Sequence, residues 1–195
     1  MGKKDNIFLV GLMGAGKTTV GRLLAKQLGK SFIDTDHEIE SRTGVKIPVI
    51  FEIEGEAGFR KREEGVIADL VCRSNIVLGT GGGAILSARN REMLRAHGTV
   101  VYLRGSPEQL HDRTRHDRNR PLLQTEDPLA KLRELYAQRD PLYREMADLV
   151  VDTGRQSIAS FARQLKDKLD LIMLAADDET DNDIAGRFSN SDSVD

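Results

Sequence analysis

The stretch Gly11-Leu-Met-Gly-Ala-Gly-Lys-Thr18 follows directly on the apolar run Ile7-Phe-Leu-Val10. It fits the pattern GxxxxGK[ST], in which a glycine-rich turn joins a strand to a helix and binds phosphate groups. Apolar residues recur at helical spacing after the turn, so we predict a helix over residues 16–28. Backbone N–H groups and the positive end of the helix dipole favour an anion there. An accidental glycine turn is the less favoured interpretation, and we predict that the segment binds ATP or GTP.

The last two residues of the motif have side chains that suit a nucleotide. The Lys17 ammonium can reach the β- and γ-phosphates, and the Thr18 hydroxyl can ligate the Mg²⁺ ion that accompanies them. We therefore expect Mg²⁺ as the cofactor.

The length and charge of the chain favour one domain with a tail. The 195 residues carry a net charge of −2, but residues 175–195 contain seven acids against Arg187 alone. That tail is too polar to repay its ordering entropy, so we predict a single domain over residues 1–174 and a disordered tail without a catalytic part. The remaining body is mildly basic, which suits small anions but lacks the concentrated basic face of a nucleic-acid-binding protein.

The sequence shows neither the apolar pattern of a membrane span nor that of a signal peptide. No run approaches the 18 or so apolar residues of a membrane span, and the N-terminal residues lack the apolar core of a signal peptide. We expect a cytoplasmic protein without a membrane partner. The single cysteine, Cys72, cannot form an internal disulfide, and its place near the end of a helical pattern predicts a thiol in or near the core.

Strand-like and helical segments alternate along the chain. Such alternation predicts an α/β fold, a parallel sheet with helices on both faces, whose ligands bind beyond the carboxyl ends of the strands. The predicted strands are Ile7–Val10, Phe32–Ile33, Asn75–Leu78, Thr99–Leu103 and Asp148–Val151, and the predicted helices cover residues 16–28, 36–44, 56–72, 87–97, 106–115, 127–145 and 156–172.

Two acids follow the second predicted strand. If Asp34 and Asp36 continue an extended segment, both carboxylates point the same way, so one can hold Mg²⁺ through water and the other a substrate hydroxyl. The alternative is that one of them only caps the next helix. His37 beside them matches no metal-ligand spacing, and we expect it on the surface.

A glycine run, Gly79-Thr-Gly-Gly-Gly83, follows the third predicted strand. Consecutive glycines cost backbone entropy, so a close approach of the main chain to a ligand explains them better than a flexible turn. Many P-loop proteins place a magnesium-binding Asp at the end of a corresponding strand. This strand ends without one, which leaves Asp34 as the more plausible ion partner.

Arginines gather in the polar segment of residues 111–124, at Arg113, Arg115, Arg118 and Arg120. An arginine on a closing loop can stabilise the charge that develops during phosphoryl transfer, although a run of charges is more often solvated surface. Two single arginines, Arg60 and Arg139, would not be selected by composition alone.

Several separated motifs together resemble the shikimate kinase family over residues 5–170. They are GLMGAGKTT from Gly11, DTD from Asp34, IFEIEGEAGFR from Ile50, GTGGG from Gly79, RPLL from Arg120 and RDPLY from Arg139. The resemblance implies a P-loop fold of the nucleoside-monophosphate-kinase type, with a five-stranded parallel sheet and a mobile lid at about residues 111–124. It also implies transfer of the ATP γ-phosphoryl group to the 3-hydroxyl of shikimate, a step of aromatic amino-acid biosynthesis.

The resemblance assigns roles position by position. The implied catalytic residues are Lys17, Asp36 and Arg120. The implied substrate-binding residues are Asp36 for the hydroxyls, Arg60 and Arg139 for the carboxylate, and Gly81 and Gly82 for the ring substituents. The implied ATP-binding residues are Gly14, Ala15, Gly16, Lys17, Thr18, Thr19, Arg113, Arg120 and Gln156. The implied metal site is Thr18 with Asp34 through water, and the implied assembly is a monomer with shikimate and ATP as its partners.

Two rival functions stay open at this point. A gluconate kinase would share the P-loop and the lid but would not need Arg60, the glycine run and Arg139 together. A nucleotide-dependent switch would bind nucleotide without shikimate-dependent release of ADP. Pro48 departs from the family pattern, but proline is tolerated in the first turn of a helix.

Overall fold

The computed structural model describes residues 5–115, 121–154 and 156–172 and shows a five-stranded parallel sheet. The strand order is β2-β3-β1-β4-β5, with every neighbouring pair parallel. This confirms the predicted sheet. The strands are β1 (Ile7–Val10), β2 (Ser31–Asp34), β3 (Ile76–Gly79), β4 (Thr99–Arg104) and β5 (Leu149–Asp152).

The central strand β1 places the nucleotide motif at the middle of the sheet edge. Ile7 is in register with Val77 of β3 and with Thr99 of β4, and all four β1 residues are buried. A continuous apolar run is the pattern of a strand that is covered on both faces. The loop that follows β1 therefore starts from a fully buried strand at the centre of the sheet.

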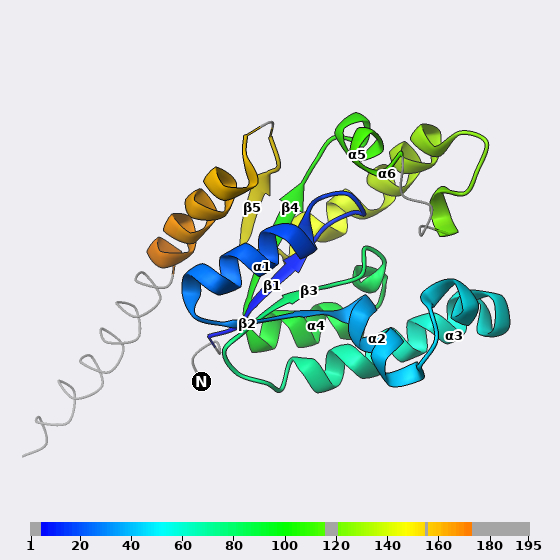
Figure 1. Cartoon of the computed structure of the whole chain (residues 1–195), viewed down its shortest axis with the longest axis horizontal. Helices are drawn as coiled ribbons and strands as arrows, with labels where there is room; N and C mark the ends of the chain where they lie inside the picture. The colour runs from blue at the N-terminus through cyan, green and yellow to red at the C-terminus, as the bar shows by residue number, and fades with distance from the viewer. Residues whose placement is uncertain (1–4, 116–120, 155, 173–195) are drawn as a thin grey trace, which may run out of the picture.

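Helices cover both faces of the sheet (Figure 1). In that view α1 lies in front of the strands, while α4 and α6 pass behind them. The helices are α1 (Lys17–Leu28), α2 (Thr35–Thr43), α3 (Ile47–Leu70), α4 (Ala88–His97), α5 (Pro107–Thr114), α6 (Pro128–Met146) and a last helix over residues 158–172, with short 3₁₀ turns at Ala84–Leu86 and Pro121–Leu123. These bounds confirm the predicted helices to within a few residues, except at the start of α3.

Helix α3 is longer than the sequence pattern predicts. Its first part, residues 47–54, lies outside the predicted helical ranges, and it joins the second part through Gly55, whose φ of 69° and ψ of −177° are not helical. Pro48 lies in the first turn, where proline is tolerated. The first part carries apolar residues on every side, so it has no single apolar face for periodicity to detect.

Cys72 is exposed, so the prediction of a thiol in or near the core is wrong. Helix α3 ends at Leu70, and Val71 is the last buried residue before the chain turns toward β3. The helix therefore ends two residues before Cys72. The predicted tail lies outside the described residues, and among the residues described no helix is long and apolar enough to cross a membrane.

Candidate active site

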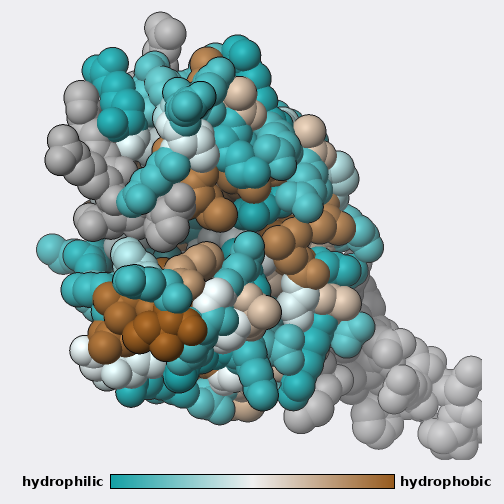
Figure 2. Space-filling view, turned by 90° about the vertical axis from the view of Figure 1, so that its right-hand side faces the viewer, coloured by the Kyte–Doolittle hydropathy of each residue, from teal (hydrophilic) through white to brown (hydrophobic). Residues whose placement is uncertain are grey.

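The loops after β1, β2 and β3 meet at one edge of the sheet and open into one cavity of about 1190 Å³. Figure 2 views the side on which α3 and α6 project and shows the surface hollowed between an upper and a lower part. Every predicted site residue within the described ranges lines this cavity: Gly14, Ala15, Gly16, Lys17, Thr18, Thr19, Asp34, Asp36, Arg60, Gly81, Gly82, Arg113, Arg139 and Gln156. Arg120 lies outside the described residues.

The loop before α1 has the backbone geometry of an anion cradle. Gly14 and Gly16 have φ angles of 80° and 91°, a left-handed conformation that glycine adopts without steric cost. Gly16 occupies the N-cap of α1 and has no side chain that could cap the helix. The N–H groups of the first turn lie at the cavity, which residues 16–19 line, and the helix dipole favours negative charge there.

The Lys17 side chain spans the same loop. Its ammonium donates to the carbonyl oxygens of Gly11, at 2.6 Å, and Leu12, at 3.0 Å. The positive charge thus lies beside the anion cradle and within the cavity that the loop lines.

Asp34 caps helix α2 and also contacts the nucleotide loop. Its Oδ1 accepts from the N–H groups of Asp36, at 3.0 Å, and His37, at 3.5 Å, at the start of α2. Its Oδ2 accepts from the Thr18 hydroxyl at 2.7 Å. These two oxygen groups are the kind of donor that Mg²⁺ prefers alongside phosphate oxygens and water. Within the described ranges, no group of three His, Cys, Asp or Glu side chains could hold a metal ion.

Asp36 reaches the cavity by a different route from the one predicted. Helix α2 begins at Thr35, so Asp36 lies in its first turn and not in an extended segment. The cap at Asp34 starts the helix at Thr35, one residue before the predicted start. The direction of the Asp36 carboxylate is therefore set by the helix and not by the alternation of a strand. His37, as predicted, is exposed.

An ion pair between Arg60 and the buried Glu63 forms part of the cavity wall. Arg60 Nη1 donates to Glu63 Oε2 at 2.7 Å, and Arg60 Nη2 donates to Glu56 Oε1 at 2.9 Å. The Glu63 side chain is fully buried, and burial raises its pKa to about 7 against the opposing effect of the Arg60 guanidinium. Glu63 Oε1 has no hydrogen-bond partner among the described residues. The ion pair therefore holds Arg60 in place through Glu63 Oε2, and Glu63 Oε1 can still accept a hydrogen bond.

Arg139 enters the same wall from α6. It is 3 % exposed, and its Nη1 donates to the carbonyl oxygen of Gly82 at 3.1 Å. Burial lowers the pKa of Arg139, but a guanidinium stays charged in proteins. Its Nε has no hydrogen-bond partner within the residues described. A buried cation with spare donors is suited to an anionic group.

The glycine run makes room for these charged side chains. A Cβ at Gly81 would lie 2.3 Å from Glu63 Oε1, and a Cβ at Gly83 would lie 2.1 Å from Arg60 Nη2. The sequence predicted that the main chain of the glycine run approaches a ligand closely. In the structure it closely approaches the side chains of Glu63 and Arg60 in the cavity wall. A flexible turn does not explain glycine at these two positions.

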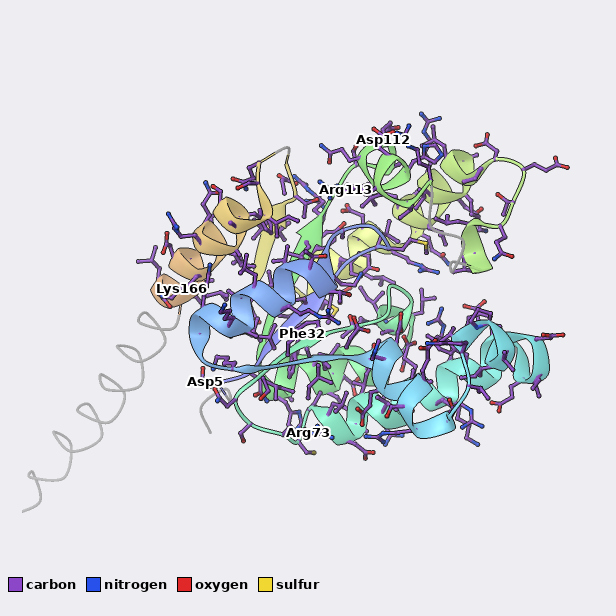
Figure 3. The ribbon with its side chains drawn as sticks, viewed as in Figure 1. Asp5, Phe32, Arg73, Asp112, Arg113 and Lys166 are labelled. Carbon is purple, nitrogen blue, oxygen red and sulfur yellow. The ribbon has the colours of Figure 1, made fainter. Side chains whose placement is uncertain are left out.

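Arg113 joins the nucleotide loop to the end of β5. Its guanidinium donates to the carbonyl oxygens of Thr153, at 2.9 Å, Gly154, at 3.2 Å, and Gly14, at 3.4 Å. Figure 3 shows it projecting from α5 toward these segments. Gln156, two residues after Gly154, is exposed at the same end of the cavity.

Two residues of the site were missed by sequence reasoning. Glu63 interrupts the apolar face that Phe59, Val66, Ile67 and Leu70 form on α3, and a single acid in such a stripe is a signal that could have been used. Tyr143 lies inside the RDPLY motif but received no role, and its hydroxyl donates to the Gly82 carbonyl at 2.5 Å.

The comparisons with known proteins agree with one family. A family model described as shikimate kinase matches residues 13–170. The shikimate kinase of Thiobacillus denitrificans is 73 % identical over 172 residues, covering 88 % of this chain and 94 % of that relative, and that of Cupriavidus pinatubonensis is 57 % identical over 92 % of this chain and 96 % of its own. A solved structure of shikimate kinase from Acinetobacter baumannii in complex with shikimate superposes with a TM-score of 0.84 at 53 % identity, covering 88 % of this chain and 94 % of that one. The chain belongs to the shikimate kinase family.

Proposed function

We propose that this chain transfers the γ-phosphoryl group of ATP to the 3-hydroxyl of shikimate. One observation carries the proposal: a single cavity joins the glycine-rich cradle before α1 to the half-buried Arg60, the buried Arg139 and the carboxylate of Asp36. A polyhydroxylated carboxylate needs guanidinium forks for its acid group and a carboxylate for its hydroxyls. The alternative of a gluconate kinase is not favoured by the family match.

In this proposal the nucleotide half binds through the backbone. The N–H groups of residues 14–19 hold the phosphates, and Lys17 exchanges its bonds to the loop carbonyls for the β- and γ-phosphate oxygens. Thr18 and Asp34 would hold Mg²⁺, Asp34 through water, because both present oxygen atoms at one place. When bound, the ion neutralises charge on the phosphate oxygens. Arg113 and Gln156 lie where the far end of the nucleotide would extend.

The acceptor half binds through side chains. Arg60 and Arg139 hold the carboxylate of shikimate, Asp36 accepts from its hydroxyls, and Gly81 and Gly82 contact the ring substituents. This places the 3-hydroxyl between Asp36 and the cradle. Because the transition state of phosphoryl transfer is loose, it demands little of a base, so Asp36 acts first by orienting the hydroxyl and second by accepting its proton.

The remaining parts of the proposal concern residues 111–124 and the assembly. We place Arg120, in that segment, on the ATP phosphates as part of a lid that excludes water. The protein acts as a cytoplasmic monomer. Light scattering after size-exclusion chromatography tests the assembly, and a dimer would contradict this part without affecting the reaction.

A coupled assay for ADP formation tests the function itself. Shikimate, quinate and gluconate are offered in parallel at equal concentration with MgATP. We expect ADP release that depends on shikimate and is at least tenfold slower with the other two, since a different ring shape or hydroxyl pattern leaves polar groups of the site unpaired. Binding of ATP without shikimate-dependent ADP release would identify a nucleotide switch and refute the proposal.

A further inference from the structure

The carbonyl oxygen of Gly82 accepts two hydrogen bonds from the same helix. Arg139 Nη1 donates at 3.1 Å and the Tyr143 hydroxyl donates at 2.5 Å. The two donors are four residues apart on α6, so they lie on one face of that helix. A carbonyl has two lone pairs, and this one uses both on α6.

Tyr143 is held more firmly than a surface tyrosine. It is 1 % exposed, and its ring stacks on Tyr102 of β4 with centroids 4.7 Å apart and planes at 23°. Burial raises its pKa, so the hydroxyl stays protonated and donates; the charged groups that face it are Arg139, Glu63 and Arg60. The hydroxyl therefore has one fixed direction, toward Gly82.

The other tyrosine of the stacked pair, Tyr102, bonds to a residue of α6 itself. The Tyr102 hydroxyl donates to Asp140 Oδ1 at 2.8 Å, and Arg144 Nε donates to Asp140 Oδ2 at 2.6 Å. Pro141, inside α6, has no N–H for the helix and lies between the two Gly82 donors. The two stacked tyrosines are thus equally buried but have different polar partners. The Tyr102 hydroxyl bonds to Asp140 of α6, and the Tyr143 hydroxyl bonds to Gly82 of the glycine run.

We propose that Tyr143 is a positioning residue for the acceptor site. Its hydroxyl holds the Gly82 carbonyl, so that Arg139 can turn from that carbonyl to the substrate carboxylate without leaving the carbonyl unpaired. The inference rests on the proposed function, in which Arg139 binds the carboxylate. It assigns a role to a residue that does not itself touch the substrate.

The energetic consequence has a definite direction. Without the Tyr143 hydroxyl, the Gly82 carbonyl depends on Arg139 alone. Substrate binding must then break that bond, and a half-buried carbonyl that loses its last donor is costly. The cost arises when shikimate binds and is the same in the bound ground state and in the transition state, so KM for shikimate rises while kcat does not. Gly82 lies against the main chain of Gly11 and Met13, but the bonds at issue come from the side chains of Arg139 and Tyr143, so we expect the smaller effect on ATP.

The test compares Tyr143→Phe with Tyr102→Phe. Both changes remove one hydroxyl from the same buried stack, so they have similar effects on packing. We expect Tyr143→Phe to raise KM for shikimate about tenfold, which is the size of one lost hydrogen bond, with kcat and KM for ATP within twofold. Tyr102→Phe is expected to leave all three within twofold. A protein with 4-aminophenylalanine at position 143, which keeps a donor, should restore most of the affinity.

Three results would overturn the inference while wild-type activity on shikimate still supports the function. They are an unchanged KM for shikimate in Tyr143→Phe, an equal rise in Tyr102→Phe, and an equal rise in KM for ATP. If Tyr143→Phe does not fold, the test uses 4-fluorophenylalanine at position 143 instead, because this residue keeps the ring size but has no donor. If wild-type protein neither binds nor phosphorylates shikimate, both the proposed function and this inference fall.

Discussion

The two halves of the cavity are built in different ways. The phosphate-binding core of the nucleotide half comes from one contiguous segment, residues 11–19, and presents backbone N–H groups with a single lysine. The acceptor half comes from α2, α3, the glycine run and α6, and presents buried charged side chains. A local backbone motif can be recognised in any sequence, whereas a distributed set of side chains acquires meaning only when the fold brings it together.

Glycine serves both halves, but for different physical reasons. At Gly14 and Gly16 the backbone is left-handed, which other residues adopt at a cost. At Gly81 and Gly83 the φ angles are not in that region, and the space for a Cβ is occupied by Glu63 and Arg60. Substitutions should therefore separate the two halves by the substrate whose binding they change.

Lys17→Met should have the largest effect and should leave the acceptor half intact. Loss of the ammonium removes a donor to the developing charge of the transition state, so we expect kcat to fall about 10³-fold. Equilibrium binding of shikimate to the free enzyme, measured by calorimetry, should stay within twofold. Weakened shikimate binding would show that the halves are not independent.

Arg139→Lys should have the next largest effect, on the acceptor half alone. Lysine cannot supply the planar fork of a guanidinium, and we expect KM for shikimate to rise about 100-fold, with KM for ATP unchanged. Arg144→Lys on the same helix is the control, because Arg144 is 46 % exposed and pairs with Asp140. Steady-state kinetics with each substrate varied in turn decide the matter, and a rise in KM for ATP would count against the assignment.

Gly83→Ala tests the steric reason for the glycine run. The added Cβ would lie 2.1 Å from Arg60 Nη2, so the flexible guanidinium must move. We expect a folded protein whose KM for shikimate is about tenfold higher, the value of one lost charged hydrogen bond. Gly65→Ala serves as the control, since nothing lies within 4 Å of a Cβ there. Equal kinetics in the two variants would refute the steric explanation.

Glu63→Gln should have the smallest effect, seen in the pH dependence of stability. Burial raises the pKa of Glu63 from 4.5 to about 7, so the folded state holds a proton that the unfolded state releases between these pH values. Glu63 therefore lowers the free energy of unfolding progressively as pH rises from about 4.5 to 7, and the loss is complete above pH 7. The variant lacks this slope.

Urea unfolding at pH 5, 6, 7 and 8 measures the difference. The unfolding free energy of Glu63→Gln relative to wild type should increase with pH up to 7 and then level off. The adjacent carboxylate provides the control Glu64→Gln, because Glu64 is 32 % exposed and bonds to Ser87 and Arg89. A flat difference for Glu63→Gln would mean that the burial of this carboxyl does not control its proton.

The order of strands and helices, the phosphate-binding loop and the parallel sheet were all predictable from the chain alone. Each depends on residues close in sequence, such as the apolar run of β1 followed by Gly11–Thr18, and on the spacing of apolar residues along helices. The separated motifs also pointed to the family that the comparisons confirmed.

Three features depended on where helices begin and end and could not be predicted from the spacing of apolar residues. Asp36 faces the cavity because Asp34 starts α2 early, Cys72 is exposed because α3 ends before it, and the first part of α3 has no apolar face of its own. Burial raised the pKa of Glu63. Packing of α6 against the glycine run brought the side chains of Arg139 and Tyr143 to one carbonyl oxygen. Local propensity decides which segments form helices and strands, but desolvation and side-chain pairing arise only when the folded chain excludes water from residues far apart in sequence.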